Sequence, residues 1–207
     1  MSSRVFDSWR TWTEAEPVLR ERLPAEVVER LALVYRFAAD WHADQRRPAG
    51  EPYVEHLLQA LEVAIEVGGA TSTEVLTATL LHDVVEDTPC TIDQVREEFG
   101  PQVAELVAWV TKPEPGPDDD PKAVRAAYLG SFTGAPLDVL VVKLSDRYSN
   151  VQRLDTHPRP EKRASYYAET VRWVVPLTPL APQFVAVFTE WRDQFAYLGS
   201  EEGTGHA

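Results

Sequence analysis

The sequence predicts an all-α protein with a single domain. Apolar residues recur at three- and four-residue steps along most of the chain, which is the spacing of one buried helix face. Glycine and proline interrupt these stretches, but no interruption is long enough to act as a linker between two domains. With 207 residues, 44% of them hydrophobic, the chain can bury a substantial core.

The expected helices are bounded by glycine, proline and capping residues. They cover residues 26–42, 54–67, 72–87, 91–99, 102–111, 122–131, 137–154, 160–175 and 179–197. The first is clearly amphipathic, and Gly68-Gly69 ends the second. Pro89 ends the third, because a proline disfavours helical geometry at the residue before it. Thr91 and Gln94 form a capping box at the start of the fourth.

One segment of the second half also suits a strand. The run VLVVKL at 139–144 is short and apolar, as buried strands are. The three- and four-residue steps that join Lys143, Arg147 and Asn150 favour a helix instead. We therefore predict a helix through this run.

Two proline-rich stretches mark expected loops inside the domain. RRPAGEPY at 46–53 and KPEPGPDDDP at 112–121 are predicted as loops, the second of them exposed. We divide the chain into an N-terminal helical extension at 1–25, the domain at 26–198 and a disordered tail at 199–207.

Net charge, apolar runs and cysteine content argue against several classes of partner and indicate a cellular location. A net charge of −13 argues against a broad nucleic-acid-binding face, which needs clustered lysine and arginine. No apolar run approaches the roughly 20 residues that span a bilayer, and the first residues lack the apolar stretch of a secretory signal. The single cysteine, Cys90, suits a reducing compartment. We expect a cytoplasmic protein that binds neither nucleic acid nor membrane, with its oligomeric state left open.

The stretch LLHDVVEDTP at 80–89 places charged groups among leucine and valine. Its polar residues include His82, Asp83, Glu86 and Asp87. Buried charge is costly unless it is paired or bound to a metal. Acids near a helix C-terminus also face the unfavourable end of the helix dipole. On one continuous helix, His82 stacks on Glu86 and Asp83 stacks on Asp87, so a cation is expected against this face.

Two further stretches supply ligands for such a cation. PYVEH places His56 on the second helix, and KLSDRYSN places Asp146 after an apolar run. With His82 and Asp83 they form a His₂Asp₂ set that suits a divalent first-row metal and requires three helices to converge. The other histidines are expected to be surface or hydrogen-bonded core residues: His42, His157 and His206.

Together these segments resemble the HD-domain hydrolase region of the RelA/SpoT family, in particular its stand-alone small alarmone hydrolases. The likeness is carried by RRPAGEPYVEH, LLHDVVEDT, TIDQVREEFGPQVAELVAWVTK, VVKLSDRYSN and, more weakly, AETVRWVVPL. It covers residues 26–177 in the family's order and spacing. The resemblance implies an HD-domain helical bundle and a Mn²⁺-dependent hydrolase of the 3′-pyrophosphate of ppGpp or pppGpp, although the ligand set also accepts other divalent metals.

The resemblance also implies a role for each matching residue. The implied metal ligands are His56, His82, Asp83 and Asp146, and the implied catalytic pair is Glu86 and Asp87. The expected substrate-binding residues are Arg46, Arg47, Tyr53, Lys143, Arg147 and Asn150. Arg47, Tyr53 and Asn150 match family positions. The others are chosen because arginine and lysine supply the positive charge that a polyphosphate needs in an acidic protein.

Several positions depart from the family's pattern. Pro48 replaces a lysine, Leu57 replaces a proline, and Tyr148-Ser149 replaces leucine-histidine. We expect these differences to affect the substrate pocket. Two alternatives stay open: an HD-domain phosphohydrolase for another nucleotide or phosphate ester, and a non-catalytic regulatory module that binds an alarmone.

Overall fold

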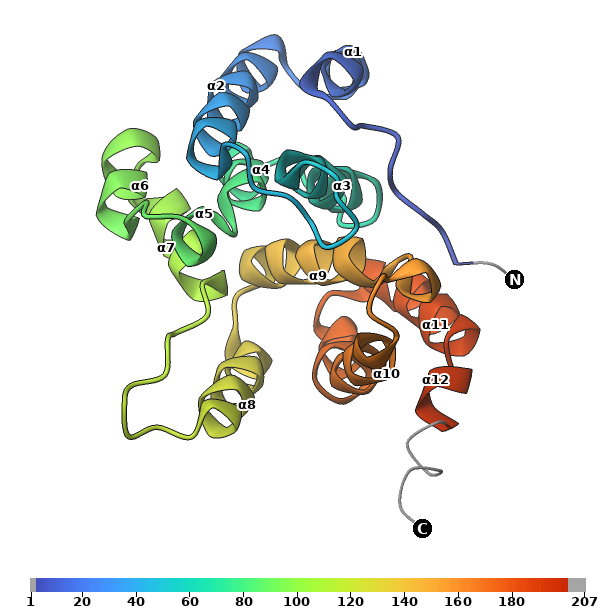
Figure 1. Cartoon of the computed structure of the whole chain (residues 1–207). Helices are drawn as coiled ribbons and strands as arrows, with labels where there is room; N and C mark the ends of the chain where they lie inside the picture. The colour runs from blue at the N-terminus through green and yellow to red at the C-terminus, as the bar shows by residue number, and fades with distance from the viewer. Residues whose placement is uncertain (1–2, 201–207) are drawn as a thin grey trace.

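Residues 3–200, which the computed structural model describes, form helices joined by loops, and none of them forms a β-strand (Figure 1). The α-helices are α1 (Trp12–Arg22), α2 (Ala25–His42), α3 (Tyr53–Glu66), α4 (Thr73–Leu81), α5 (Val84–Asp87), α6 (Ile92–Phe99), α7 (Pro101–Val110), α8 (Pro121–Ser131), α9 (Leu137–Val151), α10 (Pro160–Glu169), α11 (Val185–Gln194) and α12 (Tyr197–Ser200). Short 3₁₀ and π turns complete the chain: η1 (Phe132–Gly134), η2 (Leu154–Thr156), η3 (Thr170–Val174), η4 (Val175–Leu180) and η5 (Pro182–Phe184). The prediction of a single all-α domain is confirmed.

Helix α9 lies at the centre of the molecule. It packs against α3, α4 and α7 on one side and against η3 and η4 on another (Figure 1). Contacts on several sides bury nearly the whole helix, including Val139, Leu140, Val142 and Leu144. This all-round burial explains why the run at 139–144 has no polar face and resembles a strand in sequence.

The glycine pair after α3 ends that helix, as predicted. Gly69 has a φ of 63°, a conformation that residues with a Cβ rarely adopt. A Cβ on Gly68 would lie 3.0 Å from the Val141 side chain of α9 and 2.6 Å from the carbonyl oxygen of Ala64. Gly68 therefore permits the close approach of α3 and α9, which carry two parts of the candidate site.

The predicted continuous helix at 72–87 is wrong, because the chain turns at His82 and Asp83 between α4 and α5. The ring Nδ1 of His82 lies 2.8 Å from the carbonyl oxygen of Thr79. In a regular helix that oxygen accepts the backbone N–H of Asp83, so the His82 side chain competes with the helical hydrogen bond. At this turn Asp83 Oδ2 lies 3.0 Å from His82 Nε2.

The C-terminal helices are shorter than predicted. The helix expected at 160–175 ends as α10 at Glu169 and passes into the π turn η3. The helix expected at 179–197 begins only at Val185, after two 3₁₀ turns. Proline in this stretch has no N–H for a helical hydrogen bond, which accounts for the irregular backbone before α11.

The N-terminal residues pack on the rest of the chain. Phe6 and Trp9 are buried, and the Phe6 ring meets the Tyr148 ring of α9 edge-on at 5.8 Å. Helix α1 lies within the predicted extension at 1–25. Gly199 belongs to α12 rather than to the expected tail, and residues 201–207 of that tail, with His206, lie outside the described residues.

Candidate active site

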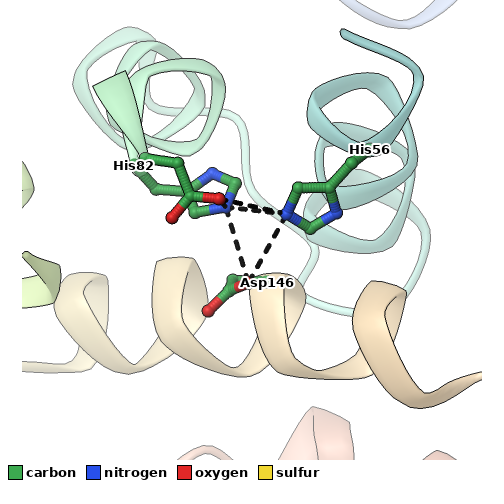
Figure 2. A group of neighbouring side chains, drawn as sticks. His56, His82 and Asp146 are labelled. Atoms are coloured by element: carbon green, nitrogen blue, oxygen red, sulfur yellow. Dashed lines mark hydrogen bonds and ion pairs between the residues drawn. The ribbon is translucent and has the colours of Figure 1, made fainter. Parts of the chain in front are cut away.

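Three helices bring the four predicted ligands together. His56 lies on α3, Asp146 on α9, and His82 and Asp83 form the turn between α4 and α5 (Figure 2). One potential ligand atom from each residue lies within 4.8 Å of all the others. The Nε2 atoms of His56 and His82 are 3.0 Å apart. The Asp146 Oδ1 lies 3.6 Å from His56 Nε2 and 3.5 Å from His82 Nε2.

Hydrogen bonds on the far side of each imidazole direct its other nitrogen into the cluster. His82 Nδ1 donates to the Thr79 carbonyl, which can only accept. His56 Nδ1 lies 3.0 Å from the Ser149 hydroxyl, which donates its own proton to the Asp146 carbonyl at 2.8 Å. The hydroxyl therefore accepts the His56 proton. Both Nε2 atoms then face the cluster, where each can bind a metal once it carries no proton.

The electrostatics of the cluster favour a cation at its centre. Burial lowers the pKa of His56. Burial alone would also lower the pKa of His82, but the carboxylates of Asp83 and Asp146 together outweigh it and raise that pKa well above its usual value. Burial opposes ionisation of Asp146, yet Lys143 and His82 lower the pKa of its carboxyl. Two imidazoles and two carboxylates in this arrangement fit a divalent first-row metal.

The two acids of the predicted catalytic pair are held differently. Both oxygens of Glu86 are bound by Lys112, with its backbone N–H 3.0 Å from one oxygen and its Nζ 2.8 Å from the other. Asp87 instead accepts a hydrogen bond from the Tyr53 hydroxyl at 2.7 Å. Burial, aided by the charges of Asp83 and Glu86, raises the pKa of Asp87. Asp87 thus takes up a proton more readily than an ordinary aspartate.

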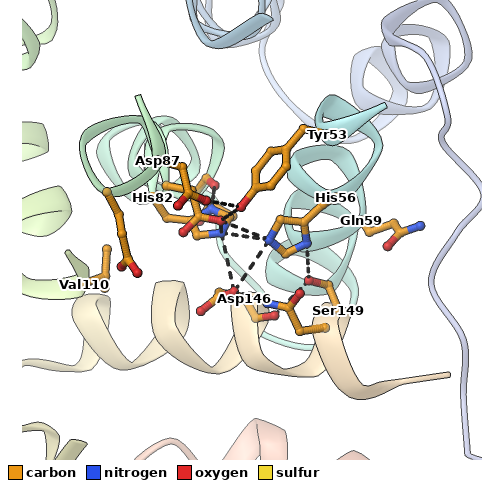
Figure 3. A network of polar contacts seen from close by, with 12 residues as sticks. Tyr53, His56, Gln59, His82, Asp87, Val110, Asp146 and Ser149 are labelled. Atoms are coloured by element: carbon orange, nitrogen blue, oxygen red, sulfur yellow. Dashed lines mark hydrogen bonds and ion pairs between the residues drawn. The ribbon is translucent and has the colours of Figure 1, made fainter. Parts of the chain in front are cut away.

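Tyr53 links the cluster to Asp87 (Figure 3). Its hydroxyl is 2.6 Å from Asp83 Oδ2 as well as 2.7 Å from Asp87 Oδ2, although it has only one proton to donate. Its ring stacks on His42 at 4.5 Å. His42 is a buried residue bonded through Nδ1 to Gln45, but its Nε2 has no hydrogen-bond partner among the described residues, so the expectation of a hydrogen-bonded core histidine is met at one nitrogen only. The stacked rings fix the position of the Tyr53 hydroxyl between the two carboxylates.

Lys143 and Arg147 lie behind the ligands and pair with acids. Lys143 Nζ is buried and donates to Asp146 Oδ2 at 2.9 Å. Burial would lower the pKa of Lys143, but Asp146 and Tyr128 together outweigh it and raise that pKa. Arg147 donates to Glu169 at 2.6 Å, and Arg125 binds the same carboxylate. These arginines lower the pKa of Glu169 to about 2 against the effect of its burial.

A cleft of about 290 Å³ opens beside His56. Among its lining residues are Arg46, Arg47, Tyr53, Asn150 and Arg153. Arg47 donates to Asn150 at 3.0 Å and to Gln59 at 3.1 Å, and Asn150 donates to Asp146 at 2.6 Å. The cleft is therefore connected to the ligand cluster through Asn150.

The predicted substrate-binding residues therefore lie in two locations, the cleft and the buried side of α9 behind the ligands. Arg46, Arg47, Tyr53 and Asn150 line the cleft. Lys143 and Arg147 are not among its lining residues; each is buried and bonded to a carboxylate.

The sequence did not predict the roles of two residues that hold site side chains in place, Ser149 and Lys112. Ser149 appears there only as a departure that affects the substrate pocket, whereas its hydroxyl holds His56. Lys112 stands at the start of the predicted loop at 112–121 and carries no signal that connects it to Glu86. These contacts join Ser149 of α9 to His56 of α3 and Lys112, after α7, to Glu86 of α5, and no local spacing in the sequence indicates them.

No helix among residues 3–200 is long and apolar enough to cross a membrane.

Comparisons with known proteins agree with this geometry. The profile of the HD domain family matches residues 34–177. The bifunctional (p)ppGpp synthase/hydrolase SpoT of Escherichia coli is 35% identical over 163 residues, which are 77% of this chain and 23% of that protein. The guanosine-3′,5′-bis(diphosphate) 3′-pyrophosphohydrolase of Aquifex aeolicus is 37% identical over 149 residues, covering 72% of this chain and 21% of that protein. The chain thus spans less than a quarter of these relatives.

A solved structure extends the likeness to a protein of similar size. It is described as a metazoan ortholog of SpoT that hydrolyzes ppGpp. It superposes with a TM-score of 0.71 at 26% identity and covers 83% of this chain and 96% of that one. These similarities confirm the resemblance that the motifs indicate.

Proposed function

Because the chain belongs to the HD domain family, we propose that it is a metal-dependent hydrolase that removes the 3′-pyrophosphate of ppGpp or pppGpp and leaves GDP or GTP. The observation that carries the proposal is the convergence of four ligand atoms within 4.8 Å, beside two acids and an arginine-lined cleft. The names of the relatives and the metazoan structure support the substrate. A pure binding module has no need of both acids.

Four residues would hold the metal: His56, His82, Asp83 and Asp146. We propose Mn²⁺, a metal compatible with imidazole and carboxylate ligands. When bound, a divalent cation polarises a phosphoryl oxygen and makes a nearby water easier to deprotonate. Lys143 and Ser149 hold the ligands in place, one through the Asp146 carboxylate and the other through the His56 ring.

Asp87 and Glu86 act on the attacking water in different ways. Asp87 takes the proton as the water attacks the phosphorus joined to the 3′ oxygen, because its raised pKa suits a proton acceptor. Glu86, with both oxygens bound by Lys112, orients the water. The P–O3′ bond breaks, and the 3′ oxygen takes up a proton while pyrophosphate leaves. Tyr53 positions the carboxylate of Asp87.

The cleft holds the nucleotide. Arg46 and Arg47 bring positive charge to its mouth, and Asn150 has both a donor and an acceptor for a ribose or base edge. Lys143 and Arg147 add positive charge behind the ligands, although each is already paired. The free, buried thiol of Cys90 is consistent with a cytoplasmic location, which we also propose.

A substrate panel at fixed Mn²⁺ tests the proposal. It compares ppGpp and pppGpp with GTP, ATP and a simple phosphate ester, and it detects pyrophosphate separately from phosphate. We expect turnover of the two alarmones with release of pyrophosphate. Turnover of another nucleotide alone would shift the proposal to a different phosphohydrolase, and tight ppGpp binding without turnover would favour a regulatory module.

A further inference from the structure

The N-terminal segment at 3–8 is attached to the C-terminal end of α9. The side-chain amide of Gln152 accepts the Phe6 N–H at 2.7 Å and donates to the Phe6 carbonyl at 3.0 Å. The hydroxyl of Tyr148 donates to the Arg4 carbonyl at 2.8 Å. Tyr148 is one of the positions that depart from the family's pattern. These contacts fix the path of the segment beside the cleft, because Gln152 also lines it.

The same segment places an acid against one arginine of the cleft. The carboxylate of Asp7 pairs with the guanidinium of Arg153. The Arg153 side chain is 54% exposed and lines the cleft. Since a guanidinium has five N–H donors and this pair uses one of them, Arg153 keeps donors for a ligand.

Arg153 is the cleft arginine best placed for phosphates far from the ligand cluster. Arg47 is committed to Asn150 and Gln59, and Arg46 donates to Gly50 of its own loop. Asp146 and Asn150 lie one turn apart on α9, and Arg153 follows two residues after that helix ends at Val151, so Arg153 lies beyond Asn150 along the chain from the ligand Asp146. A nucleotide whose 3′-phosphates meet the cluster extends its 5′-phosphates away from it.

We infer that Arg153 binds the 5′-phosphate chain of the nucleotide and that Asp7 determines specificity there by opposing each added phosphate. This inference rests on the proposed function and names the residue pair that selects between its two substrates. The Asp7 carboxylate cancels part of the positive charge of Arg153 and repels a longer chain. Asp7 therefore offsets part of the advantage that Arg153 alone would give to the longer 5′ chain of pppGpp.

The test uses GDP and GTP, which differ only in the length of the 5′ chain. Their dissociation constants are measured by calorimetry with the Mn²⁺-loaded wild type and with the variants Asp7→Asn and Arg153→Gln. The control is Asp93→Asn, which removes an exposed ion pair between Asp93 and Arg96 on α6. We expect Asp7→Asn to tighten GTP about two- to fivefold more than GDP, the scale of an exposed charge pair. Arg153→Gln weakens GTP more than GDP, and Asp93→Asn changes neither.

Each contrary result has a distinct meaning. An unchanged GTP-to-GDP ratio in both Asp7→Asn and Arg153→Gln would overturn the inference. Weaker GTP binding by Asp7→Asn would also overturn it, because the acid would then support Arg153 rather than limit it. Absence of any guanine-nucleotide binding by wild type, together with no turnover of ppGpp, would instead count against the proposed function itself.

Discussion

The ligand cluster and the cleft beside it differ in how many of their polar side-chain atoms already have hydrogen-bond partners within the protein. In the cluster, each histidine has one nitrogen bonded outward and one directed inward, and the carboxylate of Asp146 is held by Lys143 and Asn150. In the cleft, Arg46 bonds only within its own loop, and Arg153 is half exposed beside Asp7. A substitution in the cluster leaves a buried polar partner without its hydrogen bond, whereas a substitution at an exposed cleft arginine leaves its partner in contact with water. We therefore expect large effects from the cluster and graded effects from the cleft.

Removal of a ligand should have the largest effect. His82→Ala and Asp83→Ala each remove one of the four potential ligand atoms that lie within 4.8 Å of one another, which weakens the hold on the metal. We expect loss of bound metal, measured by elemental analysis, together with hydrolysis falling to background. Asp93→Ala, a change of an exposed acid on α6, is the matched control and should retain both. Full metal content in Asp83→Ala would contradict the ligand assignment.

Asp87→Asn should separate chemistry from metal binding. The amide keeps the size of the side chain but accepts no proton, so we expect metal content to be preserved while kcat falls by about 10²-fold or more. Single-turnover rates of pyrophosphate release measure this directly. Normal turnover would remove Asp87 from its assigned role.

Ser149→Ala should weaken the metal site without removing a ligand. The change deletes the acceptor for His56 Nδ1, and loss of such a support typically costs about 10- to 100-fold in metal affinity. Calorimetric titration with Mn²⁺ measures the effect. Ser145→Ala, one turn earlier on α9, is a close control because its buried hydroxyl has no hydrogen-bond partner among the described residues. Equal affinities for the two variants would show that Ser149 does not support His56.

Lys112→Met should have a smaller effect on the rate. It removes the Nζ contact to Glu86 but leaves the backbone N–H contact, so we expect kcat to fall about three- to tenfold with unchanged metal affinity and KM. Lys112→Arg restores a cation and should recover part of the loss. Lys122→Met, at the start of α8, serves as the control. A rise in KM without a change in kcat would place Lys112 in substrate binding instead.

Arg46→Gln should have the smallest effect. Its guanidinium is exposed and, within residues 3–200, bonded only to the Gly50 carbonyl, so we expect KM for ppGpp to rise by no more than about threefold. Steady-state kinetics at two salt concentrations measures the change, which should shrink at high salt. A loss of kcat would show that Arg46 acts closer to the chemistry than the cleft geometry indicates.

The same contrast explains what the sequence could predict. His56, His82, Asp83 and Asp146 lie in short motifs of metal-binding residue types, so the sequence could predict that the four converge. The turn at His82 could not be read from the apolar pattern, because it depends on the bond between that side chain and the Thr79 carbonyl. Contacts such as Lys112 with Glu86 join segments far apart in the chain, and local spacing carries no information about them.

The most direct test of the account is the release of pyrophosphate and GDP from ppGpp by the purified protein, first with Mn²⁺ and then with EDTA. We expect both products in equal amounts with Mn²⁺ and neither with EDTA, because the four ligands hold the metal on which hydrolysis depends. Turnover that survives EDTA in protein shown to be free of metal would contradict the central claim, as would no turnover in protein shown to contain it.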